Sequence, residues 1–60
     1  MVFEDAIDKS CKINCLRDGR RYFYHAYVIG VTQTHITFID KNYKEFIYNQ
    51  DQIFNIEILR

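Results

Sequence analysis

The sequence predicts a mainly β fold, in which a short N-terminal helix precedes a five-stranded, strongly bent small barrel. Three observations predict this fold. Residues 20–31 contain no proline and are mostly aromatic or β-branched, the types that fit a pleated, half-buried strand. This strand is about twice the usual length, so we expect it to bend and to serve two parts of a sheet. Asp18 and Gly19, directly before it, favour the positive φ angles of a tight hairpin turn.

The first elements are a helix and a strand within a single domain, residues 1–60. Apolar residues recur at helical spacing near the N-terminus, which predicts an amphipathic helix over about residues 2–10. A helix this short needs a docking partner, and the open end or an edge of the barrel supplies one. Residues 11–16 alternate polar and apolar side chains, as a strand with one solvated face does.

Short polar connections separate the remaining strands. We expect the long strand to bend at Ala26 and Gly30, where small side chains make bending least costly. A single helical turn is expected shortly before the last strand, to which Ile53, Ile56 and Ile58 contribute core side chains. The remaining predicted strands are about residues 20–31, 35–40, 43–48 and 53–59.

The aromatic content is high for a chain of 60 residues, with five Tyr and five Phe. A domain of this size buries only about 60% of its unfolded surface, so its core is small and association is expected. Two interpretations of the rings remain. They fill the core as large side chains, or some of them form an exposed patch that marks an interface.

The formal net charge is zero, which argues against strong non-specific binding to nucleic acid. The charges are nevertheless unevenly distributed. Residues 1–8 carry three acidic residues and no basic one, whereas residues 9–21 carry five basic residues and one acidic one. The second segment predicts a local basic patch.

Cys11 and Cys15 lie four positions apart in a predicted strand. At the rise of a strand their Cα atoms are about 13 Å apart, too far for a disulfide, and the sequence offers no second pair or nearby histidine to complete a zinc site. We therefore predict two buried free thiols and no metal or cofactor.

No segment has the features of an enzyme or of a membrane protein. His25 and His35 have no identifiable catalytic partner, and no phosphate-binding loop or nucleophile motif is present, so we predict no enzymatic activity. There is no apolar run long enough to cross a membrane and no signal peptide with a basic start, so we expect a soluble cytoplasmic protein.

The order of elements resembles the Sm-like fold, and within it the bacterial Hfq family most closely. Leu16, Asp18 and Gly19 match the hydrophobic residue and the turn between the first two strands of that fold. The later positions match at Ala26, Val28 and Val31, with Ala26 in place of the family glycine and Thr32 in place of an aspartate.

Residues 31–53 are similar to the Hfq stretch that contains FDQF, a Lys-Asn turn and YKH. Gln33 matches the glutamine and Tyr48 the tyrosine. Thr34 stands where the family has a phenylalanine that stacks on uracil, and Asn49 with Gln50 replaces Lys-His. These departures remove a stacking ring, a positive charge and an imidazole from the implied uridine site.

The resemblance implies an RNA-binding module that acts as a ring-shaped homo-oligomer in RNA regulation. In Sm-like proteins the fourth and fifth strands pair between protomers at the sheet edges, and a ring repeats each weak contact. The pattern is also similar to the Sm-like inhibitor of the Rho termination factor, which works through protein contacts. The alternative is therefore a small protein-interaction barrel without a nucleic-acid ligand.

Two groups of residues are candidate sites for single-stranded RNA. The first combines cations, which follow phosphates, with rings, which stack on bases, although a solvated hairpin over a tyrosine core is the alternative interpretation. The second consists of groups on two loops that the Sm-like topology brings to one face. The first group is Lys12, Arg17, Arg20, Arg21, Tyr22 and Tyr24, with Tyr27 nearby; the second is Gln33, Thr34, His35, Tyr48, Asn49 and Gln50.

Overall fold

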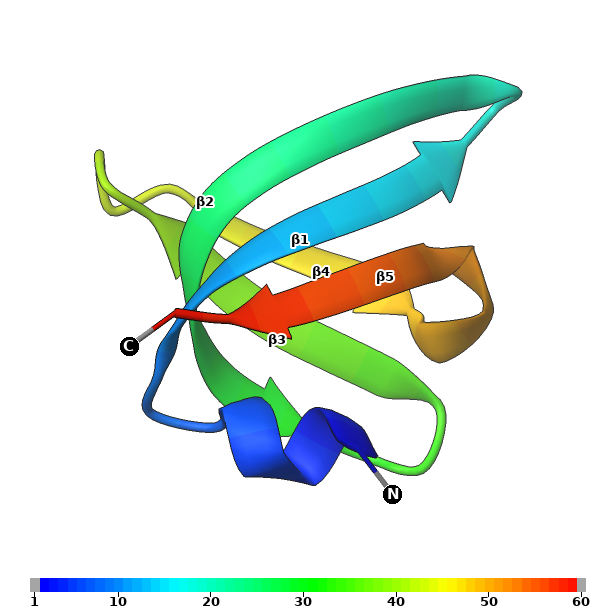
Figure 1. Ribbon diagram of the computed structural model, residues 1–60. Helices are drawn as coiled ribbons and strands as arrows, with labels where there is room; N and C mark the ends of the chain where they lie inside the picture. The colour runs from blue at the N-terminus through cyan, green and yellow to red at the C-terminus, as the bar shows by residue number, and fades with distance from the viewer. Residues whose placement is uncertain (1, 60) are drawn as a thin grey trace.

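One antiparallel sheet of five strands forms most of the computed structural model, which describes residues 2–59 (Figure 1). The strand order is β4-β3-β2-β1-β5. This confirms the predicted mainly β class and the number of strands. The elements in chain order are the 3-10 helix η1 (Val2–Ala6), β1 (Ser10–Arg17), β2 (Arg20–Val31), β3 (His35–Asp40), β4 (Glu45–Asn49), the 3-10 helix η2 (Gln50–Gln52) and β5 (Ile53–Ile58).

Strand β2 serves two partners, as its length predicts. It pairs with β1 from Arg20 to Tyr27 and with β3 from Ala26 to Val31. The register with β3 shifts between Val28 and Gly30, which is a β-bulge at the position between them. Bulges increase the local twist and bend the strand that carries them. Figure 1 shows the resulting strong curvature of β2, which folds the sheet around one core.

The two edge strands are β4 and β5, joined in sequence by η2. Each pairs with one neighbour only, β4 with β3 and β5 with β1. Within residues 2–59 no hydrogen-bonded ladder joins β4 to β5. The bent sheet is therefore not closed, and the predicted closure into a barrel is not observed.

The helix predicted over residues 2–10 is wrong in length and type, because η1 is a 3-10 helix that ends at Ala6. After it the backbone turns toward β2 and pairs with that strand. Asp8, with φ of 65°, donates its N–H to the carbonyl of Val28 at 2.8 Å, and the Val28 N–H donates to Lys9 at 3.3 Å. These long-range hydrogen bonds take the place of the helical hydrogen bonds that a helix over residues 2–10 would form. No helix within residues 2–59 has the length and apolar character needed to cross a membrane.

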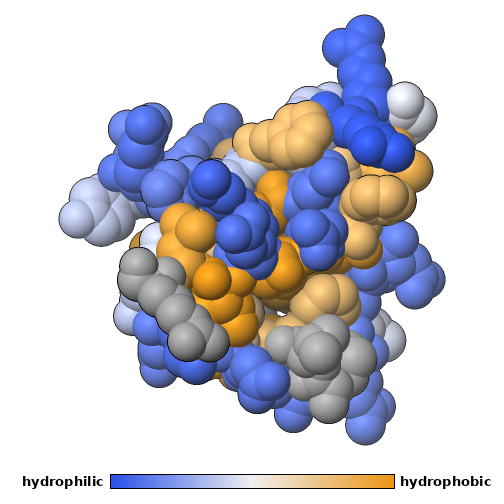
Figure 2. Space-filling view, in the orientation of Figure 1, coloured by the Kyte–Doolittle hydropathy of each residue, from blue (hydrophilic) through white to orange (hydrophobic). Residues whose placement is uncertain are grey.

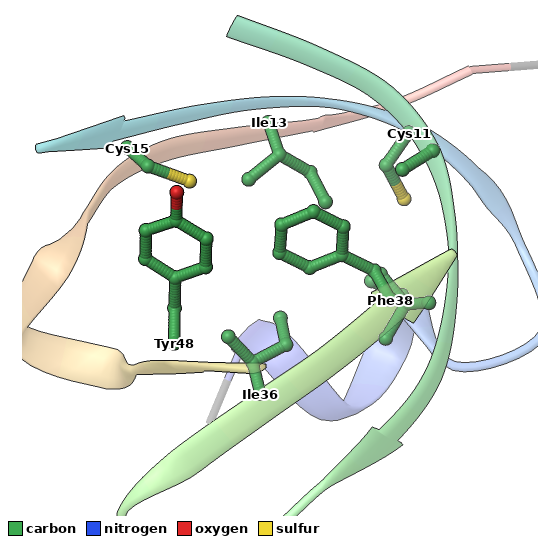
Figure 3. Packing of buried hydrophobic residues seen from close by; sticks show 9 residues of the cluster. Cys11, Ile13, Cys15, Ile36, Phe38 and Tyr48 are labelled. Carbon is green, nitrogen blue, oxygen red and sulfur yellow. The ribbon is translucent and has the colours of Figure 1, made fainter. Parts of the chain in front are cut away.

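The core lies on the concave side of the sheet and includes the two cysteines, which are buried and free as predicted (Figure 3). The Tyr48 ring stacks on Phe38 with centroids 5.7 Å apart, and its hydroxyl is 2.8 Å from that of Tyr24. In Figure 3 the Tyr48 hydroxyl points toward the Cys15 sulfur. The buried residues are Ala6, Cys11, Ile13, Cys15, Ala26, Val28, Ile36, Phe38 and Tyr48, with Ile53, Ile56 and Ile58 packed against them as predicted.

Burial changes the acidity of these core groups. Desolvation raises the pKa of the Cys15 thiol from 9.0 to about 11, and the nearby Arg17 charge opposes this only in part. Desolvation also raises the pKa of Tyr48, and the hydrogen bond with Tyr24 raises it further. Both groups are therefore neutral in the folded protein at physiological pH.

The raised pKa of Cys15 predicts that the protein loses stability in alkaline solution. The thiol ionises near pH 9 in the unfolded chain but near pH 11 in the folded one, so the unfolded state binds fewer protons in this window. The free energy of unfolding should therefore fall as the pH rises from about 9 to about 11. Urea denaturation under reducing conditions at several pH values measures this slope. Cys15→Ala should flatten it, and an equal slope in the variant contradicts the assignment.

Candidate nucleic-acid interface

The hairpin between β1 and β2 begins the candidate site. Asp18 and Gly19 have φ of 54° and 76°, and Arg17 and Arg20 pair across the strands that the turn joins. Positive φ at both turn residues matches the twist of the flanking strands, so the Asp-Gly turn predicted from the sequence is confirmed. The hairpin projects from the rest of the sheet at the upper right of Figure 1.

Strand alternation divides the first predicted site between two faces of the sheet. Tyr22 pairs with Cys15 and Tyr24 with Ile13, whose side chains are buried, so the two half-buried tyrosines face the core side. Arg21, which neighbours Tyr22 in β2, lies on the opposite side of the sheet, which we name the outer face. Lys12 also lies on the outer face, while Arg17 and Arg20 share the core side. The predicted cations and rings do not form one cluster.

On the core side, cations lie over a chain of ring contacts. We name Tyr22, Tyr24 and Phe46 the aromatic row. The ring centroids are 6.4 Å apart for Tyr22 and Tyr24, and 4.7 Å apart for Tyr24 and Phe46. At one end the Arg17 guanidinium lies 5.7 Å from the centroid of Tyr22, and at the other the Lys44 ammonium lies 5.6 Å from that of Phe46. The row thus has a cation at each end.

Tyr48 lies behind this row rather than on the surface. Its ring is only 1% exposed, and the Arg17 guanidinium covers it at 5.2 Å from the centroid. The Arg17 guanidinium thus lies near the rings of both Tyr22 and Tyr48. Because Tyr48 is buried, it offers no face for base stacking.

The outer face carries a shallow groove of about 410 Å³ across β2, β1 and β5. The Phe23 ring borders it and is 74% exposed. Asn14 pairs with Phe23 on one side and with Asn55 on the other, so two amides lie beside the ring. The Oδ1 atom of Asn14 is buried without a hydrogen-bond partner. The groove therefore combines an exposed aromatic ring with two amide side chains.

Phe54 extends the outer face toward the hairpin. Its ring is 64% exposed, and the Arg21 guanidinium lies 4.6 Å from the ring centroid. The register of β1 with β5 shifts beside Asn14, so Asn55 pairs with Asn14 while Ile53 pairs with Cys15. This bulge leaves Phe54 without a partner. The sequence pattern does not predict the exposure of Phe54 and Phe23, because a bulge interrupts the alternation of β5 and neither face of β2 is polar.

The second predicted site forms a cluster between the β2–β3 loop and η2, which we name the loop cluster. The Gln50 N–H donates to the Thr34 carbonyl at 2.8 Å, and its side-chain Nε2 donates to the Thr32 carbonyl at 2.5 Å. His35 pairs with Asn49 across β3 and β4. The structure brings the predicted residues together except Tyr48. The loop cluster is Gln33, Thr34, His35, Asn49 and Gln50.

The hollow beside the loop cluster mixes polar and apolar side chains, and the described residues that line it include no cation. Its volume is about 770 Å³, and Gln33, Gln50 and Thr32 contribute to its lining. Among the lining residues within 2–59, Glu4 is the one that carries a charge. A carboxylate repels phosphate, so this hollow offers hydrogen bonds without the charge that supplies most nucleic-acid affinity.

An apolar hollow of about 490 Å³ runs between η1 and β5, which we name the edge hollow. Phe3, Ile53, Ile56 and Ile58 line it, together with Asp5. In Figure 2 hydrophobic residues reach the surface in the middle of the face that carries η1 and β5, and hydrophobic colour continues toward the upper right. The edge hollow lies along β5, whose outer edge is unpaired within the described chain.

Comparisons of the chain with protein-family models, with curated proteins and with solved structures gave no match.

Proposed function

We propose that the protein is an Sm-like module that binds single-stranded RNA in the cytoplasm and acts as a homo-oligomer in RNA regulation. The architecture supports this proposal. Strands β4 and β5, which pair between protomers in the fold that the sequence resembles, are the two edges here. The Asp-Gly hairpin, the long bent β2 and the single helical turn before β5 also fit that fold.

The observation that carries the RNA proposal is the placement of cations over rings at the hairpin. Arg17 lies over Tyr22 on the core side, and Arg21 lies over Phe54 on the outer face. Base stacking on such rings tolerates any sequence, while the guanidinium groups pair with the backbone. A net charge of zero is compatible with this arrangement, because the hairpin concentrates the positive charge that the site needs.

Replacement of the hairpin arginines tests the RNA function. Arg20→Ala with Arg21→Ala should weaken binding of a mixed-sequence single-stranded RNA. It should also flatten the dependence of log K on log salt by about 0.7, because the two arginines lie on opposite faces and a strand that follows one face loses one phosphate contact. The single variants identify the face that the RNA uses, because Arg20 faces the core side and Arg21 the outer face. Fluorescence anisotropy over a salt series gives both values.

Lys9→Ala is the matched control, since it removes one exposed cation outside the hairpin. Its affinity and salt slope should equal those of the wild type. Phe23→Ala should weaken binding without changing the salt slope if the outer face is used, because it removes only a ring. A wild-type protein that binds no RNA at low salt refutes the proposed function.

The free edges support the homo-oligomer proposal. β4 presents Ile47, which is 59% exposed, and β5 borders the edge hollow. Edge strands with apolar side chains and unpaired backbone groups favour pairing with a further strand. We propose that β4 of one copy pairs with β5 of the next, which places an apolar side chain of β4 near the edge hollow. Each free edge strand then gains a hydrogen-bonded partner strand from a neighbouring copy.

Light scattering before and after nuclease treatment tests this assembly. The wild type should have a mass of several protomers, and Ile47→Glu should have the mass of one, because a buried unpaired carboxylate at the interface is costly. Glu45→Gln on the same strand is the control and should assemble, because it adds no charge. A wild type that stays monomeric at high concentration contradicts the proposal.

A second candidate function is a small protein-interaction module, as in the Rho-inhibitor alternative. The observation that favours it is the number of large apolar side chains that remain exposed on a chain without net charge. Their exposed fractions are 85% for Tyr43, 74% for Phe23, 64% for Phe54 and 59% for Ile47. Such residues are typical anchors of protein interfaces.

Copurification from a cell extract distinguishes the two functions. An RNA-binding module should bring down nucleic acid that nuclease removes. A protein-interaction module should bring down a protein that survives nuclease treatment, and Phe23→Ala or Tyr43→Ala should release it. A nuclease-sensitive band without a protein partner excludes the second function.

A further inference from the structure

The outer face of β2 carries exposed aromatic side chains at alternate positions. Phe23 is 74% exposed and Tyr27 is 42% exposed, and both lie on this face because their neighbours in β2 face the core. His25 lies between them and is also exposed. Four residues of a strand span about 13 Å, so a ligand that contacts both rings must be extended along β2.

Two hollows lie on the outer face and share His25 as a lining residue. The first is the groove of about 410 Å³ that Phe23 borders. The second has a volume of about 540 Å³, and we name it the tyrosine hollow because Tyr27 and Tyr43 line it. Ile39 also lines it and pairs with Tyr27 across β2 and β3, which places this hollow on the outer face. The groove and the tyrosine hollow are therefore neighbours along β2.

The two faces of the sheet differ in how open their rings are. On the core side, the half-buried ring of Tyr24 packs against the rings of Tyr22, Phe38, Phe46 and Tyr48. On the outer face, by contrast, Phe23 is 74% and Tyr43 is 85% exposed. Base stacking needs an accessible ring face. The outer face therefore offers more stacking surface than the aromatic row.

Cations accompany both hollows of the outer face. The Arg21 guanidinium lies 4.6 Å from the ring centroid of Phe54, which precedes a residue of the groove in β5. Lys12 lines the groove itself, and Lys41 lines the tyrosine hollow. A phosphate backbone that runs along β2 on this face meets a cation at each hollow, which is the charge complementarity that single-stranded nucleic acid needs.

Within residues 2–59, the carboxylates that line these two hollows are Asp40 and Glu57. The Asp40 Oδ1 accepts two backbone N–H groups of its own turn, and Glu57 pairs with Lys12 in the register of β1 and β5. The helix η1 packs against the core, so its acidic residues, Glu4 and Asp5, add their negative charge on the other side of the sheet. A polyanion is therefore favoured on the outer face.

A hydrogen-bonding side chain lies beside the most exposed ring of β2. Asn55 is exposed and lines the groove together with Phe23. In the sheet, Asn14 separates these two residues and pairs with each of them. An amide offers both donors and an acceptor, which match the edges of an unpaired base. A base that stacks on Phe23 thus shares the groove with the Asn55 amide.

We propose that single-stranded RNA follows the outer face of β2, with one base stacked on Phe23 beside the Asn55 amide and another base held in the tyrosine hollow. This inference rests on the proposed RNA-binding function and names the face and the side chains that the RNA contacts. The aromatic row on the core side then serves as packing rather than as a ligand surface.

Replacement of the exposed rings tests the stacking contacts. Phe23→Leu keeps an apolar side chain but removes the ring, and it should weaken binding of a mixed-sequence RNA of about 12 nucleotides by about 5- to 150-fold, the range for one stacked base. Tyr27→Leu should act in the same direction. Phe23→Tyr and Tyr27→Phe keep the rings and should bind like the wild type. Fluorescence anisotropy measures the affinities, and thermal unfolding checks that each variant is folded.

A matched pair of lysine variants tests which face the phosphates follow. Lys12→Ala removes an exposed cation of the groove, so it should weaken binding and flatten the salt slope by about 0.7. Lys44→Ala removes an exposed cation that lies over Phe46 on the core side, and it should change neither value. His25→Glu places a carboxylate between the two hollows and should weaken binding more than His25→Gln does.

The outcomes separate this inference from the function on which it rests. If the wild type binds RNA while Phe23→Leu and Lys12→Ala bind it equally well, the inference is overturned and the RNA function stands. If the wild type binds no RNA at low salt, both are overturned. Loss of a copurifying protein in Phe23→Ala, with RNA affinity unchanged, also overturns the inference and assigns the outer face to a protein interface.

Discussion

The pairing of β2 with two partners is the constraint on which the rest of the structure depends. Within residues 2–59 all five strands belong to one sheet, so this sheet must curve to enclose the core. β2 makes this possible, because it pairs with β1 along its first part and with β3 along its last. The bulge between Val28 and Gly30 lets it bend between them. The core side chains then converge from strands that are distant in sequence.

Local chemistry explains which parts of this fold the sequence could predict. The Asp18–Gly19 turn and the long β2 depend on the conformational preferences of neighbouring residues, and both are present. The N-terminal helix was predicted too long, because Asp8 and Lys9 find hydrogen-bond partners on β2 that no local pattern reveals. Likewise β4 begins at Glu45 rather than at residue 43, because the side chain of Asp40 extends the preceding turn.

The candidate site was harder to predict, because it depends on which face of each strand meets the core. Tyr22 and Tyr24 face the core side only because Cys15 and Ile13, their partners on β1, are buried. Their neighbour Phe23 is therefore exposed, although the sequence of β2 has no polar face to indicate it. The exposure of Phe54 depends on a bulge, and no feature of residues 53–59 predicts where a bulge falls. The direction of these side chains therefore depends on how the strands pair in the sheet and not on the local sequence.

The loop cluster and the hairpin differ in the chemistry that they offer. The loop cluster keeps the glutamine of the Hfq-like pattern at Gln33, but the described residues that line its hollow include Glu4 and no aromatic ring. The hairpin instead holds arginines over aromatic rings on both faces of the sheet. In the function that we propose, RNA recognition relies on the arginines and rings of the hairpin.

The hydroxyl pair of Tyr24 and Tyr48 also gives the protein a spectroscopic probe of its own core. The chain has five tyrosines and no tryptophan, so tyrosine dominates its near-ultraviolet signal. Tyr48 is enclosed by Phe38 and Arg17, and its hydroxyl has a fixed partner. Near-ultraviolet circular dichroism depends on such fixed packing and is lost when a core becomes fluid. The packing of these few residues can therefore be followed in solution without a label.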